Sequence, residues 1–237
     1  MPIYRIADLN VEVNPKFKIC RKRLESYAVK SNESGKTDIA ISVSDDEIRE
    51  RLRLADNLSE QGAEDVLILS KFCNAVLDGF DGFFFHSSCL ELDGEGYVFS
   101  AVSGTGKSTH TALWRRHFGN RVTMINDDKP VIRKCDGKFY AYGTPWMGKA
   151  DIGTNTKAPV KAVYILKRAE ENTAVRVLPS QVMKQLLEAT VIDVERSRME
   201  KLLELLDEFF KETPLFLLGC NMDESAVMTA YNAANGG

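Results

Sequence analysis

The spacing of hydrophobic residues divides the chain into two stretches of different texture. Up to about residue 80, the pattern predicts one or two short strands over 3–13 and another over 38–43. A helix is expected to start at Ser44, which has Glu47 three residues later, the spacing of a capping box. A second helix covers 62–80, where apolar residues recur every three or four positions. We therefore predict a small N-terminal α+β region.

From residue 82 onward, short strands and turns alternate with helices. Apolar runs predict strands over 83–86, 88–92, 97–102, 122–125, 131–134, 139–142, 160–166 and 214–218. Helices are predicted over 109–118, 180–190 and 196–212, and a short terminal helix is expected to be capped by Asp223. Because hairpins alternate with crossover helices, the predicted fold class is α/β with a mixed sheet. The two predicted units are 1–80 and 81–237.

Composition narrows the classes of function. With 237 residues, 44% of them hydrophobic, the chain can bury a full core. Its net charge is −3 with both signs interspersed, so we expect no nucleic-acid partner. No apolar run approaches the roughly 18 residues of a membrane span, and no secretory segment is visible, so a cytoplasmic protein is expected. The five cysteines are scattered without a C-x-x-C pair, which indicates free thiols.

The most informative segment lies between the strand 97–102 and the helix 109–118. It reads Ser103, Gly104, Thr105, Gly106, Lys107, Ser108 and Thr109. Small residues let backbone N–H groups point inward around phosphate oxygens, and a helix N-terminus adds positive potential. In a loop of the form G-x-x-x-x-G-K-[ST], Lys107 would reach the β- and γ-phosphates and Ser108 would reach Mg²⁺. The usual first glycine is Ala101 here. The flanking strand and helix favour an ATP site over a chance glycine-rich turn.

Two adjacent carboxylates, Asp127 and Asp128, follow the strand that comes after the loop helix. Neighbouring carboxylates repel each other, which favours a bound cation or a raised pKa on one of them. A carboxylate with a raised pKa would suit a base that accepts a hydroxyl proton. A solvated turn before Pro130 is the alternative interpretation. Next to a nucleotide loop, we favour the functional one.

The order of His86, a strand pair, the loop and the acidic pair resembles the catalytic domain of HPr kinase/phosphorylase. More distantly it resembles the nucleotide core of ATP-dependent phosphoenolpyruvate carboxykinase, whose loop reads S-G-T-G-K-T. The resemblance covers roughly 82–170 and implies a mixed sheet into which the loop is inserted. It also implies that Lys107 binds phosphates, that Asp127 is the general base, and that His86 supports the acidic pair. Ser108 and Asp128 would hold Mg²⁺.

The chain departs from that family downstream of the acidic pair. The family carries a glutamate and an arginine in an E-x-R-G pattern, whereas this chain reads Tyr140-Ala141-Tyr142-Gly143. Arg168 is a candidate to supply the missing positive charge. The next segment, 143–149, has two interpretations that stay open. It is either a substrate-side loop in which Lys149 meets an anionic group, or a rigid connector with Trp146 in the core.

We therefore expect an ATP- and Mg²⁺-dependent kinase that transfers the γ-phosphoryl group to a hydroxyl. By the resemblance, the acceptor is a serine of a protein or peptide, with a small molecule as the other option. A nucleotide-binding regulatory module without turnover is the main alternative. A carboxykinase-like lyase is less favoured, since those enzymes are about twice as long. The apolar stripe of the helix 196–212 fits either the core or a homo-oligomer interface.

Overall fold

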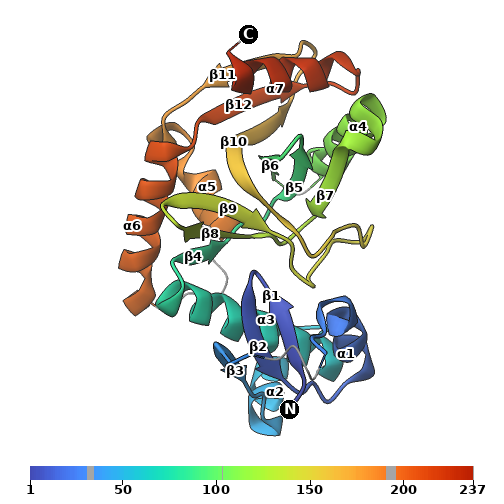
Figure 1. Ribbon diagram of the computed structural model, residues 1–237, viewed down its shortest axis with the longest axis vertical. Helices are drawn as coiled ribbons and strands as arrows, with labels where there is room; N and C mark the ends of the chain where they lie inside the picture. The colour runs from blue at the N-terminus through green and yellow to red at the C-terminus, as the bar shows by residue number, and fades with distance from the viewer. Residues whose placement is uncertain (31–34, 103, 191–195, 237) are drawn as a thin grey trace.

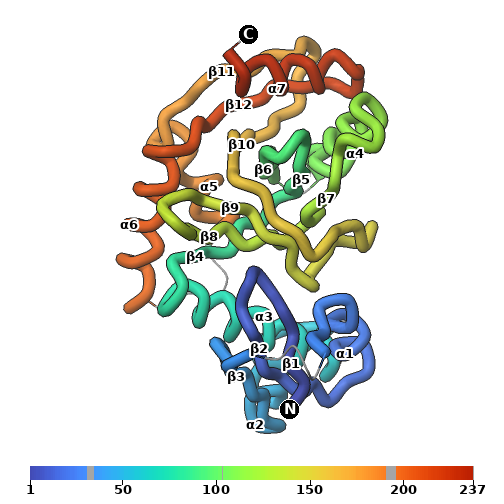
Figure 2. The backbone as a smooth tube through the Cα atoms, viewed as in Figure 1, coloured from blue at the N-terminus to red at the C-terminus, as the bar shows by residue number. Residues whose placement is uncertain are grey.

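The protein is described by a computed structural model that covers residues 1–30, 35–102, 104–190 and 196–236. Its N-terminal part holds a three-stranded sheet in which β1 (Ile3–Ile6) pairs antiparallel with β2 (Leu9–Val13), and β2 pairs parallel with β3 (Ile39–Ile41). The helices here are α1 (Lys18–Leu24), α2 (Asp45–Arg53) and α3 (Glu60–Gly79). The N- and C-termini lie at opposite ends of the molecule (Figures 1 and 2).

The predicted capping box at the start of α2 is confirmed. The Ser44 hydroxyl accepts from the Glu47 backbone N–H at 3.2 Å, and the Glu47 carboxylate accepts from the Ser44 N–H at 2.8 Å. Each group satisfies a donor that the first turn of a helix leaves without a partner.

The rest of the chain is built on a larger mixed sheet, as predicted. Its main path runs β4-β8-β9-β10-β6-β5-β7, with β12 added beside β10 and β11 beside β12. The strands are β4 (Gly82–Phe84), β5 (Ser88–Leu92), β6 (Glu95–Ser100), β7 (Val122–Asn126), β8 (Val131–Cys135), β9 (Lys138–Tyr142), β10 (Lys157–Arg168), β11 (Thr173–Arg176) and β12 (Leu215–Cys220). The long strand β10 pairs antiparallel with β9 through its first three residues and parallel with β6 and β12 further along. The sheet is therefore strongly curled (Figure 1).

Helices cover both faces of this sheet. Successive side chains of a strand point to opposite faces, so Val163 and Ile165 of β10 pack in the cluster with α5 (Met183–Thr190) and α6 (Arg196–Glu212). The intervening Tyr164 packs in the cluster with α4 (Lys107–Phe118) and α7 (Ser225–Asn235). The aromatic rings of Phe99 and Phe216 stack on Tyr164 at centroid distances of 5.0 and 5.4 Å. The result is a three-layer α/β arrangement.

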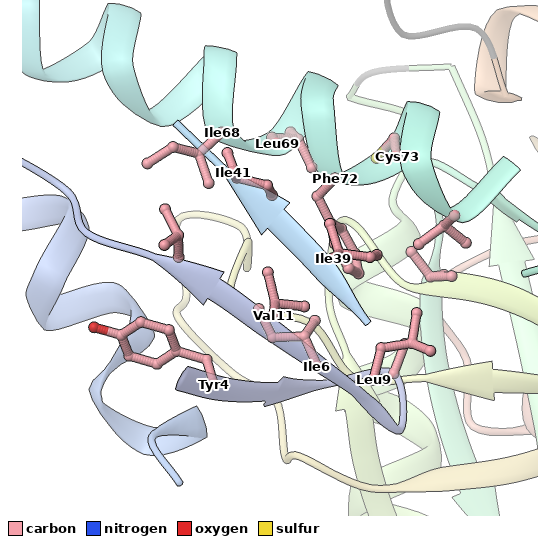
Figure 3. Close-up of a cluster of buried hydrophobic side chains, with 14 of the residues drawn as sticks. Tyr4, Ile6, Leu9, Val11, Ile39, Ile41, Ile68, Leu69, Phe72 and Cys73 are labelled. Carbon is pink, nitrogen blue, oxygen red and sulfur yellow. The ribbon is translucent and has the colours of Figure 1, made fainter. Parts of the chain in front are cut away.

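A further core joins the small sheet to α3. Figure 3 shows apolar side chains of the three N-terminal strands facing Ile68, Leu69 and Phe72. The same cluster takes in Trp146, which is 2% exposed and stacks on Phe72 at a centroid distance of 5.6 Å. Of the two interpretations of the segment 143–149, core packing by Trp146 is therefore correct. The domain boundary at residue 80 stays a prediction.

Four local features differ from the sequence expectations. Helix α1 and strand β11 were not expected, because α1 buries only Cys20 and Leu24 and β11 is mostly exposed. Helix α4 begins at Lys107, two residues before the predicted start. Asp223 does not cap α7. The residue before the helix is Glu224, whose side chain makes no cap hydrogen bond, and Asp223 contributes only its backbone carbonyl to the Ala226 N–H.

Two expectations from the sequence concern membrane-spanning helices and the state of the cysteines. Within the described ranges, no helix combines the length and apolar character that crossing a bilayer requires. All five cysteines are free thiols, as expected.

Replacing Trp146 tests its place in the core. We expect Trp146→Ala to lower the free energy of unfolding by about 3–5 kcal/mol, because a large buried ring is lost and a cavity remains. The nearby Lys149→Ala, at an exposed position, is the control and should change stability little. Urea denaturation of both variants checks this, and equal stabilities would contradict the assignment.

The buried side chain of His110 on α4 should make the stability of the fold depend on pH. This side chain is 2% exposed, accepts a hydrogen bond from Trp114 Nε1 at 3.0 Å, and has its pKa lowered by burial to about 4. In the unfolded chain His110 takes up a proton near pH 6.5, whereas in the folded protein it does so only near pH 4. The unfolded state therefore binds more protons below pH 6.5, and the free energy of unfolding falls as the pH is lowered.

Between pH 6.5 and 5 we expect the folded protein to lose about 2 kcal/mol through His110. Over the same pH interval, the free energy of unfolding of His110→Gln should fall by about 2 kcal/mol less than that of the unmodified protein, as measured by urea denaturation at each pH. Parallel pH profiles for the two proteins would rule out this source of acid sensitivity.

Candidate functional site

The glycine-rich loop connects the end of β6 to the start of α4. Ser103 lies outside the described residues, so the loop is seen from Gly104 onward. Gly104 and Gly106 have φ values of +80° and +116°, a region that glycine enters without the penalty other residues meet. Nothing lies within 4 Å of a Cβ built at either position, so backbone conformation rather than space requires glycine here. The loop brings the unpaired N–H groups of the first turn of α4 to the surface beside exposed Ser108 and Thr109.

Arg168, the last residue of β10, braces this loop. Its guanidinium donates to the carbonyl oxygens of Gly104 at 2.6 Å and Thr105 at 3.4 Å. In a planar trans peptide the C=O and N–H point in opposite directions, so the Gly106 N–H points away from Arg168. Arg168, a candidate for the charge missing near Tyr142, contacts the loop instead. The guanidinium thereby fixes the orientation of the peptide groups.

The acidic pair stands on a turn organised by Asn126, the last residue of β7. The side-chain oxygen of Asn126 accepts from the backbone N–H of Asp128 at 2.8 Å and of Lys129 at 2.6 Å. Its amide nitrogen donates to the carbonyl of Thr144 at 3.0 Å. Asn126 is fully buried, and these bonds use both ends of its side chain. One residue therefore fixes the acidic turn and ties it to the segment after β9.

Both oxygens of Asp128 have protein partners. His86 Nε2 lies 2.9 Å from Oδ1, and Lys129 forms an ion pair with Oδ2. Burial acts to raise the pKa of Asp128, but the hydrogen bonds from His86 and Lys129 outweigh it and hold the pKa below the ordinary range. Lys129 is thus paired with the acidic turn.

His86 is itself held in place by contacts with α5, with β6 and with the acidic turn. Its backbone N–H donates to Ala189 at the end of α5 at 2.7 Å, and its carbonyl accepts from the Ser100 hydroxyl at 3.1 Å. The ring then contacts Asp128 as the resemblance implied. The structure therefore brings His86, the end of β6 and the acidic turn together.

Asp127 is buried and held by the segment that follows β9. Its Oδ1 accepts from the Gly148 N–H at 2.7 Å, while Oδ2 accepts no hydrogen bond from the described residues. A Cβ at Gly148 would lie 3.1 Å from Oδ2 and 3.3 Å from the Asp128 Cβ, so this position needs a small residue. Lys149, which one of the two interpretations of this segment placed against an anionic group, is exposed.

The charge of Lys107 interacts with the acidic pair. Burial lowers the pKa of Lys107, and the negative charges of Asp128 and Asp127 act in the opposite direction. Lys107 and the two carboxylates form a cluster of mixed charge. Such a cluster can bind an anion at the lysine and a cation at the carboxylates. Because β6 and β7 both pair antiparallel with β5, the loop that follows one and the acidic pair that follows the other lie at the same edge of the sheet.

The donor set suits a hard cation such as Mg²⁺. Ser108 brings a hydroxyl and Asp128 a carboxylate, and Mg²⁺ takes most of its remaining ligands from water and phosphate. In the described part of the chain, no group of three or more histidine, cysteine or acidic side chains is arranged to hold a metal by itself. Lys129 would have to release Oδ2 for Asp128 to serve as a ligand.

Sequence reasoning identified the loop and the acidic pair but missed their supports. Asn126 carried a signal, since asparagine at a strand end often bonds backbone groups two and three residues later. Gly148 and Arg168 carried no local signal, because their partners lie 21 and 64 residues away in the chain.

Comparisons with known proteins add little to this geometry. No family model matches the chain, and no curated protein sequence matches it. A solved structure of the Hpr(Ser) kinase/phosphatase from Coxiella burnetii is similar over 65% of this chain and 93% of that chain, with 12% sequence identity and a TM-score of 0.38. This is a distant structural similarity.

Removing the brace on the loop should weaken phosphate binding. We expect Arg168→Ala to reduce the affinity for Mg²⁺·ATP about tenfold, since two carbonyls lose a charge-assisted donor and the loop loses its fixed orientation. Arg176→Ala, on the exposed strand β11, is the matched control and should bind normally. Titration calorimetry measures both, and unchanged affinity in Arg168→Ala would contradict the bracing role.

Proposed function

We propose that this chain is an ATP- and Mg²⁺-dependent kinase that transfers the γ-phosphoryl group to a hydroxyl. One observation carries the proposal. A glycine-rich loop that leads into Lys107 follows β6, and Asp127 and Asp128 follow β7, whose end lies at the same edge of the sheet because both strands pair with β5. Loops of this kind bind polyphosphate through backbone N–H groups, and facing carboxylates are where phosphoryl-transfer enzymes place a base and a metal ligand.

Each residue of the site has a role in the proposed reaction. Backbone groups from Gly104 to Thr109 hold the phosphates, and Lys107 neutralises charge on the β- and γ-phosphates. Asp127 accepts the hydroxyl proton, since its Oδ2 has no hydrogen-bond partner among the described residues. His86, in the connection between β4 and β5, keeps Asp128 ionised and oriented. Catalysis then consists mainly of positioning and charge neutralisation.

Magnesium would be held by the hydroxyl of Ser108 and the carboxylate of Asp128. When bound, the ion neutralises charge on the phosphates. Without the ion, Lys129 is paired with Oδ2 of Asp128, and its positive charge compensates the negative charge of the turn.

A nucleotide-binding module without turnover is the second candidate. It is favoured by the fact that both Asp128 oxygens already bind protein groups, and by Tyr140-Ala141-Tyr142-Gly143 in place of the charged E-x-R-G pattern. A module of this kind would bind Mg²⁺·ATP and leave it intact.

Substitution of the proposed base separates these candidates. We expect Asp127→Asn to reduce phosphoryl transfer by at least about a hundredfold, because the proton acceptor is lost, with little change in Mg²⁺·ATP affinity. Lys107→Ala should weaken both binding and transfer. The measurements are calorimetry with Mg²⁺·ATP and transfer of label from γ-labelled ATP, to water or to components of a cell extract.

The control for the base is Asp207→Asn, a change of the same kind at an exposed position on α6. It should leave both measurements unchanged. Full transfer by Asp127→Asn would remove Asp127 from its role. Binding without any transfer in the unmodified protein would favour the regulatory module.

A further inference from the structure

A cavity of about 720 Å³ opens beside the glycine-rich loop, at the ends of β6 and β10. This volume lies within the range of sites that take small molecules. An apolar floor is supplied by Ile165 of β10, Leu217 of β12 and Val182, which directly precedes α5. The rim is polar, with Gln185 and Glu188 on the exposed side of α5. The site described above makes use of only one side of this cavity.

The cavity adjoins the acidic turn. His86 lines it, and the same imidazole contacts Asp128 at 2.9 Å. Thr105 of the glycine-rich loop lines it as well, so both halves of the proposed phosphate site border this space. The lysine of such loops contacts the β- and γ-phosphates, so a γ-phosphate between Lys107 and Asp128 would lie toward His86, with the nucleoside at the other end.

The loop itself presents an apolar side chain to this space. Val102 lines the cavity and is 66% exposed, although it precedes a loop whose other side chains are small or polar. An exposed aliphatic residue beside a concave apolar floor indicates contact with an apolar ligand. Three charged residues line the cavity. Arg168 donates to the carbonyls of Gly104 and Thr105, and Lys167 and Glu188 carry opposite charges. The lining therefore carries charges of both signs.

We propose that this cavity is the acceptor site and that the acceptor is a small, uncharged or zwitterionic alcohol with an apolar body. This inference rests on the proposed kinase function and specifies its substrate class. The apolar body would contact Val102, Ile165 and Leu217, and the polar part would contact Gln185. This choice departs from the serine of a protein, because the space is concave, bounded and of small-molecule size.

The transfer is balanced by groups already described. The acceptor oxygen forms a bond to the γ-phosphorus while the bond from that phosphorus to the β–γ bridging oxygen breaks. The electron pair of the broken bond stays on ADP. The hydroxyl proton passes to the carboxylate of Asp127.

Filling the cavity tests the proposal. Gln185→Trp places an indole in it from an exposed position of α5, and Met183→Trp adds the same ring to the same helix at an exposed residue outside the lining. The probe is benzyl alcohol, with glycerol for comparison, added with Mg²⁺ and a non-hydrolysable ATP analogue. Saturation-transfer NMR measures alcohol binding, and calorimetry measures binding of the analogue.

We expect benzyl alcohol to bind the unmodified protein and Met183→Trp in preference to glycerol, and to bind Gln185→Trp at least about tenfold more weakly. The ATP analogue should bind all three proteins equally. With γ-labelled ATP, label should pass from the unmodified protein to a small molecule of a cell extract, and Gln185→Trp should lose this transfer.

Three results would overturn the acceptor assignment. Equal binding of benzyl alcohol to Gln185→Trp would show that the cavity is not its site. Weaker binding of the ATP analogue by Gln185→Trp alone would show that the cavity holds the nucleoside. Label passing only to proteins would establish a macromolecular acceptor. If the unmodified protein does not bind the analogue, the kinase proposal fails as well, which calorimetry distinguishes from the other three.

Discussion

The buried side chain of Asn126 is the interaction on which the arrangement of the site depends. Its oxygen holds two successive backbone N–H groups of the acidic turn, and its nitrogen holds the segment at Thr144. A buried amide left without partners costs more than a typical hydrogen bond contributes, so the turn and the segment are held to one arrangement. The positions of Asp127, Asp128 and Gly148 all follow from it.

The larger sheet supplies the complementary half of the site. Because β6 and β10 are parallel and in register, with Ser100 opposite Ile165, their carboxyl ends meet at the same edge. The loop leaves one strand there, and Arg168 ends the other, close enough to bond to the loop carbonyls. Ligand sites in open α/β sheets form at such edges. The pairing of β5 with both β6 and β7 brings His86 and the acidic turn to that edge as well.

Much of the architecture was predictable because its causes are local. Alternating side chains indicated most strands, and the pair of Ser44 and Glu47 marked the start of a helix. The strand, loop and helix around Gly106 were visible for the same reason, since two glycines, a lysine and flanking apolar runs lie within some twenty residues. Contacts between distant segments left no such pattern. The stacking of Trp146 on Phe72 and the hydrogen bond from Gly148 to Asp127 depend on tertiary packing that a single sequence does not encode locally.

The stacking of Trp146 on Phe72 also ties the N-terminal region to the chemistry. Trp146 is two residues from Gly148, whose N–H holds the carboxylate of Asp127, while Phe72 belongs to α3. A fragment that starts at residue 81 would keep every proposed phosphate-binding group and yet leave an indole without its ring partner. The first 80 residues therefore support the segment that holds the carboxylate of Asp127 in place.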